Sequence, residues 1–305
     1  MITDFGADIS FCKVPDKLRE HYGITIGYSA IRNITEKHAG VADADEKTES
    51  GIPGTDGVEY IIAETDGSMI PTIGIKADSE SSDGRKKREC RWQEARPVMT
   101  HPEGSVSSVF GCTPGSTDDT GDIMLSCAIR SGMGQKTGVH CVGDGATRIA
   151  EQTDRVFGEQ GNYLIDFYHL CGYLSDASAV CSPSDPDKFF NGQKCLVKEG
   201  RMTEAVSHTR PCIGPAPIPD NKAPVRRCIR YITNRPGQFH YKEAEEKGLP
   251  VGSGEIESAH RYIVQNRLKI PGAWWKENNA QNMLPLRVLR ANGDWESYWK
   301  KADRV

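Results

Sequence analysis

The 305 residues, of which 37% are hydrophobic and 8% aromatic, suffice for one large or two ordinary domains with an apolar core. No apolar run approaches the roughly 18 residues of a membrane helix, and the first residues lack the basic and apolar regions of a signal peptide, so a cytoplasmic protein is expected. The net charge of −4 argues against a protein that coats nucleic acid over its whole surface.

Charge is distributed unevenly along the chain. Residues 221–305 contain 16 Lys and Arg against 9 Asp and Glu, a balance of +7, whereas residues 1–220 have a balance of −11. A basic end of this kind supplies the positive charge that a phosphate backbone needs. A solvated helical face has the same composition, so charge alone leaves both interpretations open.

The N-terminal residues 1–45 are predicted to contain two short helices, Asp16–Tyr22 and Tyr28–His38. Their spacing is typical of a helix-turn-helix-like DNA-binding segment, in which Arg32 and Lys37 would be available to DNA. Any small helical hairpin has the same pattern, and the sequence does not separate the two.

After a predicted linker at residues 46–57, which is acidic and rich in glycine, the chain becomes rich in β structure. Strands are expected at Val58–Thr65, Met69–Ile75, Glu89–Met99, Val106–Cys112, Val139–Val142 and Tyr163–Ile165, with turns at Asp78–Gly84 and His101–Gly104. Helices are expected from Thr117 and at Ala146–Phe157. Antiparallel strands followed by β-α-β are the order of an RNase H-like mixed sheet, so residues 58–169 are predicted to form the first part of an α/β core.

A helical insertion is predicted at residues 170–250, because the 113 residues from Asp144 to Glu257 are too many for a simple loop. Helical patterns occupy Phe167–Val180, Asp185–Glu199 and Ala223–Asn234. Residues 251–305 would then complete the core with a helix that carries Glu257 and a basic C-terminal region.

Three acidic residues have contexts that suggest a metal site. Asp66 and Asp144 each follow a short apolar, β-prone run and precede a glycine, and Glu257 opens a helical pattern. Carboxylates are hard ligands suited to Mg²⁺ or Mn²⁺, and two such ions roughly 3.5–4 Å apart stabilise the attacking and leaving oxygens of phosphoryl transfer. Each residue alone also suits a turn or a helix start, so the hypothesis depends on their joint order.

Four short motifs occur in order: Thr65-Asp-Gly-Ser-Met, Gly143-Asp-Gly-Ala, Ile165-Asp-Phe-Tyr-His169 and Gly252-Ser-Gly-x-x-Glu257. Together they resemble the successive motifs of DDE transposases from bacterial insertion sequences, closest to the ISKra type, and the likeness covers essentially the whole chain. The resemblance implies an RNase H-like catalytic core in which Asp66, Asp144 and Glu257 bind Mg²⁺ (or Mn²⁺). It also implies nicking of element ends and strand transfer into target DNA, with terminal inverted repeats and target DNA as partners, a homodimer or larger assembly on DNA, and no membrane.

Further side chains are candidates for contact with DNA. Those proposed to position phosphates are His169, Arg261, Arg267 and Lys269, and those proposed to stack on an unpaired base are Trp274 and Trp275. A pair of tryptophans also packs readily in a core.

Glu257 is preferred over Glu255 as the third carboxylate. Two residues correspond to about 200° of rotation on a helix, so the two side chains cannot face one metal pair together. Glu257 shares its face with His260 and occupies the glutamate position of the family motif, whereas Glu255 is suited to the helix dipole.

Other chemistries are less well supported. The ten cysteines lack a Cys-x-x-Cys pair, so free thiols are expected rather than disulfides or a structural zinc site. Residues 132–138 do not fit a phosphate-binding loop, because they precede a strand instead of joining a strand to a helix. The alternative function is a catalytically inactive or truncated transposase remnant that only binds DNA, and a purely structural or protein-binding role is the third option.

Overall fold

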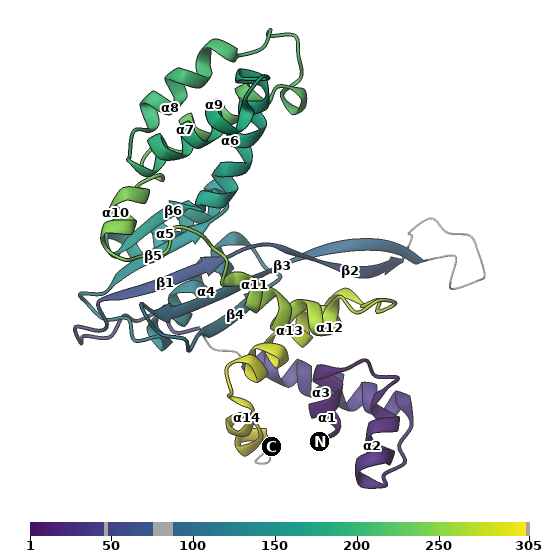
Figure 1. The fold of residues 1–305 in the computed structure, drawn as a ribbon. Coiled ribbons are helices and arrows are strands. Elements are labelled where there is room, and N and C mark those ends of the chain that lie inside the picture. Colours follow the sequence, from purple (N-terminus) through teal and green to yellow (C-terminus); the bar gives the residue numbers. More distant parts are fainter. Residues whose placement is uncertain (46–47, 76–87, 303–305) are drawn as a thin grey trace. The chain divides into compact units, whose positions relative to one another are not determined.

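The computed structural model describes residues 1–45, 48–75 and 88–302, and the predicted turn at Asp78–Gly84 lies outside these residues. The described chain is α/β, with a mixed six-stranded sheet and helices that account for most of the remaining regular structure (Figure 1). It divides into two compact units. The first unit contains residues 1–58, 65–135 and 255–305, and the second contains residues 59–64 and 136–254.

The first unit contains three antiparallel strands and the helices of both ends of the chain. Its elements are α1 (Ile2–Asp8), α2 (Val14–Tyr22), α3 (Tyr28–Asp45), β2 (Ser68–Ile75), β3 (Arg88–Pro102), β4 (Val109–Thr113), α4 (Thr117–Arg130), α11 (Ile256–Ala259), the π-helical segment η4 (His260–Gln265), α12 (Asn266–Leu268), α13 (Glu277–Ala291) and α14 (Trp295–Ala302). Strand β3 is long enough to pair with β2 along its first half and with β4 along its second half. The registers place Ser68 opposite Ala95 and Met99 opposite Phe110.

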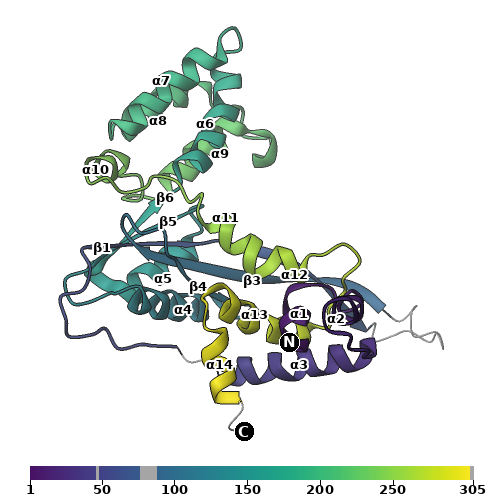
Figure 2. The same ribbon diagram turned by 60° about the horizontal axis from the view of Figure 1, so that its bottom comes forward.

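The predicted N-terminal helices are present as α2 and α3, and α3 extends to Asp45. Their buried apolar residues, such as Leu18 and Ile31, belong to the same core as Leu284 and Leu286 of α13. Figure 2 shows α3 beside α13. The N-terminal segment therefore shares its core with the C-terminal helices.

The second unit is built on parallel strands. Strand β1 (Tyr60–Thr65, of which residues 60–64 belong to this unit) pairs with β5 (Gly138–Gly143), and β5 pairs with β6 (Gly161–Ile165). The register aligns Glu64 with Val142 and Gly143 with Ile165. The strands are almost entirely buried, as expected for parallel strands.

Helices complete the second unit: α5 (Thr147–Phe157), η1 (Gly158–Gln160), α6 (Phe167–Cys181), α7 (Pro186–Lys198), α8 (Met202–Thr209), η2 (Arg210–Cys212), η3 (Asp220–Lys222), α9 (Pro224–Thr233) and α10 (Tyr241–Glu246). Helix α6 packs against α7 and α9. The predicted helices of the insertion correspond to α6, α7 and α9, whereas the shorter α8 and α10 were not predicted.

All ten cysteines lie in the described residues and are free thiols, and four of them are buried: Cys112, Cys127, Cys141 and Cys228. Among the described helices, none has the length and apolar character needed to cross a membrane.

Candidate functional site

Asp66 lies in the two-residue turn between β1 and β2. Its Oδ1 accepts a hydrogen bond from the backbone N–H of Gly67 at 2.6 Å. The side chain is about half exposed, whereas Thr65 before it is buried and donates its hydroxyl to the carbonyl of Pro97. A buried strand thus ends in a carboxylate that faces solvent.

His260 lies against this carboxylate. Its Nε2 is 3.3 Å from Oδ2 of Asp66, a close polar contact that is not a hydrogen bond. The imidazole is buried, with 5% of the residue exposed, and it opens the π-helical segment η4. Such π-helical turns occur often at functional sites, because they redirect side chains within a helix.

Glu257 lies one helical turn before His260, in the short helix α11, and is exposed. Residues three apart are neighbours on a helix, so the exposed Glu257 adjoins the buried His260. Glu255 has a different neighbour, because its Oε2 is 3.4 Å from Nε2 of the buried His101 on β3. The two glutamates therefore differ in surroundings within the first unit.

Asp144 belongs to the second unit, where it follows β5. Its Oδ1 accepts from the N–H of Ala146 at 2.9 Å, and its carboxylate is exposed. The carbonyl of Asp144 accepts from Oη of Tyr231 at 2.7 Å, and Nε of Arg235 donates to the carbonyl of Gly145 at 2.6 Å. Helix α9 and the residues after it therefore stabilise the turn that carries Asp144.

Gly145 is required at this turn for two reasons. Its φ of +83° is a conformation that residues with a side chain rarely adopt, and a Cβ there would lie 2.6 Å from Oη of Tyr231. Its N–H also donates to Oη of Tyr163 at 3.1 Å. Burial raises the pKa values of both tyrosines, so the two hydroxyls stay protonated at neutral pH.

Asp166 connects two of the sequence motifs. It follows β6 and caps α6, because its Oδ1 accepts from the N–H groups of Tyr168 and His169. Its Oδ2 accepts from both the N–H and the hydroxyl of Ser253 at 2.6 Å. Sequence analysis did not predict this role, although the Asp-x-x-His and Gly-Ser-Gly motifs carried the signal that Asp166 and Ser253 matter.

The other predicted DNA contacts differ in exposure. Lys37, His169, Arg261, Lys269 and Trp274 are exposed, and Arg32 is half-buried beside Glu36. Nζ of Lys269 donates to the hydroxyl of Ser68 at 3.4 Å, two residues after Asp66.

The expectation that Arg267 and Trp275 contact DNA is wrong for the described structure. Arg267 is 2% exposed and its guanidinium stacks on the rings of Phe11 and Trp275. Its Nε donates to the carbonyl of Gly6 at 2.9 Å, and burial lowers the pKa of Arg267 to about 10. Trp275 is 5% exposed, so both side chains belong to the core that joins the two ends of the chain.

The candidate carboxylates are thus distributed over both units. Asp66 and Glu257 belong to the first unit and Asp144 to the second. Within residues 1–45, 48–75 and 88–302, no three His, Cys, Asp or Glu side chains are already arranged to hold a metal ion.

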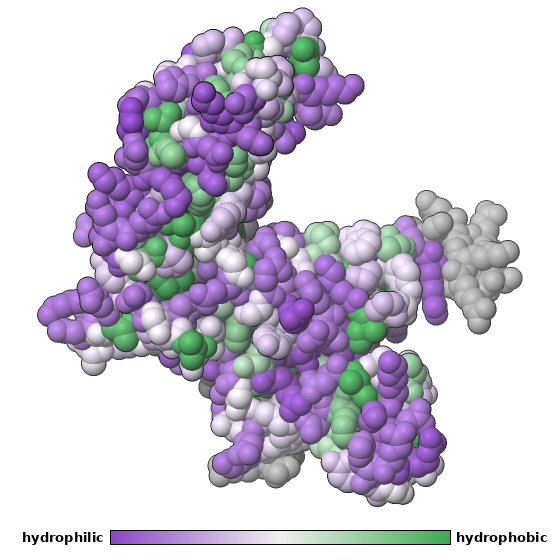
Figure 3. All heavy atoms as spheres, in the orientation of Figure 1, coloured by the Kyte–Doolittle hydropathy of each residue, from purple (hydrophilic) through white to green (hydrophobic). Residues whose placement is uncertain are grey.

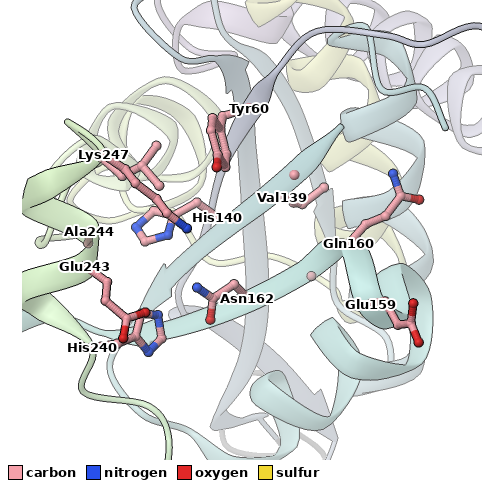
Figure 4. A pocket seen from close by; sticks show the side chains of 13 residues that line it. Tyr60, Val139, His140, Glu159, Gln160, Asn162, His240, Glu243, Ala244 and Lys247 are labelled. Atoms are coloured by element: carbon pink, nitrogen blue, oxygen red, sulfur yellow. The ribbon is translucent and has the colours of Figure 1, made fainter. Parts of the chain in front are cut away.

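A second polar feature lies at the other end of the parallel strands. A pocket of about 190 Å³ is lined by the first residues of β1, β5 and β6 and by α10 (Figure 4). Nε2 of His140 lies 2.8 Å from the carbonyl of Pro250 and Nδ1 of His240 lies 3.0 Å from that of Gly237, so each of these nitrogens donates. The opposite nitrogens, Nδ1 of His140 and Nε2 of His240, are buried and make no hydrogen bond among the described residues. The pocket is separated from Asp144 by the length of β5.

No model of a known protein family matches the chain, and no curated protein matches it. The resemblance to DDE transposases therefore depends on the motifs themselves.

Proposed function

We propose that this chain is a DDE-type DNA transposase with an RNase H-like core. Asp66, Asp144 and Glu257 would bind two Mg²⁺ (or Mn²⁺) ions, nick DNA at the ends of the element and transfer the freed 3′-hydroxyl to target DNA. We place this activity in the cytoplasm, on DNA bound by a homodimer or larger assembly.

The strand register of the parallel strands supports a shared role for the two aspartates. Glu64 of β1 pairs with Val142 of β5. Asp66 lies two residues after Glu64, and Asp144 lies two residues after Val142. The carboxyl ends of parallel strands are where open α/β sheets bind ligands. Two carboxylates at equivalent positions after neighbouring parallel strands have the chemistry and the topology that a two-metal site needs.

The contact between Asp66 and His260 carries the proposal furthest, because it links the turn of Asp66 to the helical segment that follows Glu257. The two residues are almost 200 positions apart in the sequence, and the 3.3 Å contact shows that the helical segment of His260 lies at the turn of Asp66. Glu257, on the same helix face as His260, is then the glutamate suited to complete the site. Glu255 lies beside His101 instead.

The donor set suits a hard divalent cation. The three side chains are exposed carboxylates, and the buried Nε2 of His260 lies 3.3 Å from Asp66. When bound, two Mg²⁺ ions supply the Lewis acidity that activates water and stabilises the leaving oxygen. The protein itself contributes orientation: Tyr231 and Arg235 hold the Asp144 turn by hydrogen bonds, and His260 packs against Asp66.

Positive charge near Asp66 supports binding of a phosphate backbone. Lys269 contacts Ser68 immediately after the Asp66 turn, and Arg261 is exposed next to His260. These two cations are suited to position the phosphates that flank the scissile bond.

Cleavage of DNA that carries the terminal sequences of the element tests this proposal. The purified protein should nick such DNA in Mg²⁺, whereas Asp66→Asn and Asp144→Asn should bind it without cleaving it. An amide has the shape of the carboxylate but lacks its charge, so the loss would come from metal affinity and not from packing. Binding by the wild-type protein without cleavage would instead identify an inactive remnant.

A further inference from the structure

An apolar face lies open to solvent on the ribbon formed by β2 and β3. Four large hydrophobic side chains of this region are exposed: Met69 at 44%, Ile75 at 74%, Trp92 at 60% and Trp274 at 54%. In Figure 3, white and green surface runs along this ribbon towards the grey residues. Single exposed apolar residues are ordinary, but a contiguous group marks a binding surface.

The strand register aligns the two tryptophans. Trp92 of β3 lies opposite Pro71 of β2. On the other edge of β2, Thr72 forms a parallel bridge with Trp275, and the N–H of Ile73 donates to the carbonyl of Trp275 at 2.7 Å. Thr72 and Trp275 are both buried, so the preceding residues of each segment, Pro71 and Trp274, lie on the opposite, open face.

The result is a row of three side chains, Trp92, Pro71 and Trp274, across three neighbouring segments. Adjacent segments are separated by about 4.8 Å, so the backbones that carry the two tryptophans are about 10 Å apart. This row, which we call the tryptophan row, offers two aromatic faces at a spacing that accommodates two separate planar groups. Pro71, which lies between the two tryptophans, has no backbone N–H, so it adds no hydrogen-bond donor to the row.

Within β2 and β3, three arginines outnumber two glutamates. The two acidic residues of the ribbon are neutralised by neighbouring arginines, Glu89 by Arg91 and Glu94 by Arg96. Beyond these pairs, Arg88 is an exposed cation on the same face of β3 as Trp92, and Lys276 follows the bridge to Thr72 and precedes the exposed Glu277. Lys269 contacts Ser68, which lies on the opposite, buried face of β2. Exposed aromatic side chains with surrounding cations are the composition of a surface that binds single-stranded nucleic acid.

We propose that the tryptophan row binds single-stranded DNA, with unpaired bases stacked on Trp92 and Trp274. Only unpaired bases expose the flat faces on which an indole can stack, so duplex DNA does not fit the row in the same way. Strand β2 begins two residues after Asp66, which places the row about 16 Å along the ribbon from that carboxylate. The inference rests on the proposed function for the source of the single-stranded DNA, which would be an unpaired DNA end next to the cleavage site.

Binding of a labelled oligothymidylate, measured by fluorescence anisotropy without divalent metal, tests the proposal. Trp92→Ala and Trp274→Ala should each weaken single-strand binding about tenfold, and Trp92→Phe should retain most of the affinity because phenylalanine still stacks. Affinity for a duplex of equal length should change less than twofold. Tyr168→Ala, which removes an exposed aromatic side chain from the second unit, is the matched control and should leave single-strand binding unchanged.

Three results would overturn the proposal. The first is unchanged single-strand affinity in both alanine variants, and the second is an equal loss of affinity for single-stranded and duplex DNA. The third is loss of self-association with no effect on single-strand binding, which would assign the row to contact between copies of the chain. Because both tryptophans are mostly exposed, the variants should keep the melting temperature of the wild type. Absence of metal-dependent cleavage with intact single-strand binding would refute the proposed function and leave the tryptophan row standing.

Discussion

Nε2 of His260 lies 3.3 Å from Oδ2 of Asp66, so the turn after β1 is in contact with the helical segment that follows Glu257. Asp66 is exposed and His260 is buried, so the imidazole restricts the orientations of the carboxylate from the side of the protein core. A metal ligand oriented in this way by a neighbouring side chain binds its ion more tightly than a free one.

The two glutamates at the start of α11 should differ in function. Glu257→Gln should abolish metal-dependent cleavage, because an amide removes a charged ligand on the face of His260. Glu255→Gln should keep most of the activity, because Glu255 lies beside His101 and away from that face. The measurement is cleavage rate at saturating Mg²⁺ for both variants, and an inactive Glu255→Gln beside an active Glu257→Gln would reverse the assignment.

The Asp144 turn should be sensitive to its supports. Gly145→Ala forces a side chain into a φ of +83° and towards Oη of Tyr231, so we expect a loss of about 1–3 kcal/mol in the free energy of unfolding. Tyr231→Phe removes one hydrogen bond to the Asp144 carbonyl, which corresponds to about 0.5–1.5 kcal/mol. Urea denaturation measures both values. If Gly145→Ala were as stable as the wild type, the turn would not have the described conformation.

Arg267 should behave as a core residue. Arg267→Ala removes a buried side chain stacked between Phe11 and Trp275, and we expect it to lower the free energy of unfolding by about 2–5 kcal/mol. Arg261→Ala, which removes an exposed arginine of the adjoining segment η4, should change it by less than about 0.5 kcal/mol. Thermal or urea unfolding compares the two, and similar effects would contradict the buried placement of Arg267.

Acid should destabilise the second unit through His140. Burial, with smaller contributions from His240 and Lys247, lowers the pKa of His140 below its usual 6.5, despite the hydrogen bond to Pro250. The unfolded chain therefore binds more protons between the lowered pKa and 6.5, so stability present above pH 6.5 is lost as the pH falls through this range.

His140→Gln should remove this component, because glutamine does not titrate. The free energy of unfolding, measured at intervals from pH 7.5 to pH 5, should fall less steeply in the variant than in the wild type. His38, whose pKa is also lowered, contributes equally to both proteins. Parallel pH profiles would show that His140 is not protected from protonation in the folded state.

Local sequence signals predicted most of the elements. The strands around Asp66 and Asp144 were predicted because apolar, β-prone runs end there at Asp-Gly turns, and the long helices of the insertion have strong periodicity. The strand predicted from Val106 begins at Val109 instead, since Ser105 and Ser107 form a local side-chain to backbone turn. Short helices such as α8 and α10 have too few turns for a periodic pattern.

Tertiary contacts could not be predicted in the same way. An arginine in a basic segment suggests a surface, and only the packing of Phe11 from the other end of the chain shows that Arg267 is buried. Likewise, the contact of His260 with Asp66 and that of Asp166 with Ser253 join residues distant in sequence. The exposure of Trp274 and the burial of Trp275 follow from one β-bridge to Thr72, which no local pattern encodes.

Mn²⁺ binding by the metal-free protein tests the central claim most directly, because it needs no knowledge of the DNA sequence. Calorimetric titration of the wild-type protein should show binding of two ions per chain. Asp66→Asn, Asp144→Asn and Glu257→Gln should each weaken or remove it, whereas Glu255→Gln should not. Absence of Mn²⁺ binding in the wild-type protein, or equal binding in all four variants, would contradict a metal site formed by these three carboxylates.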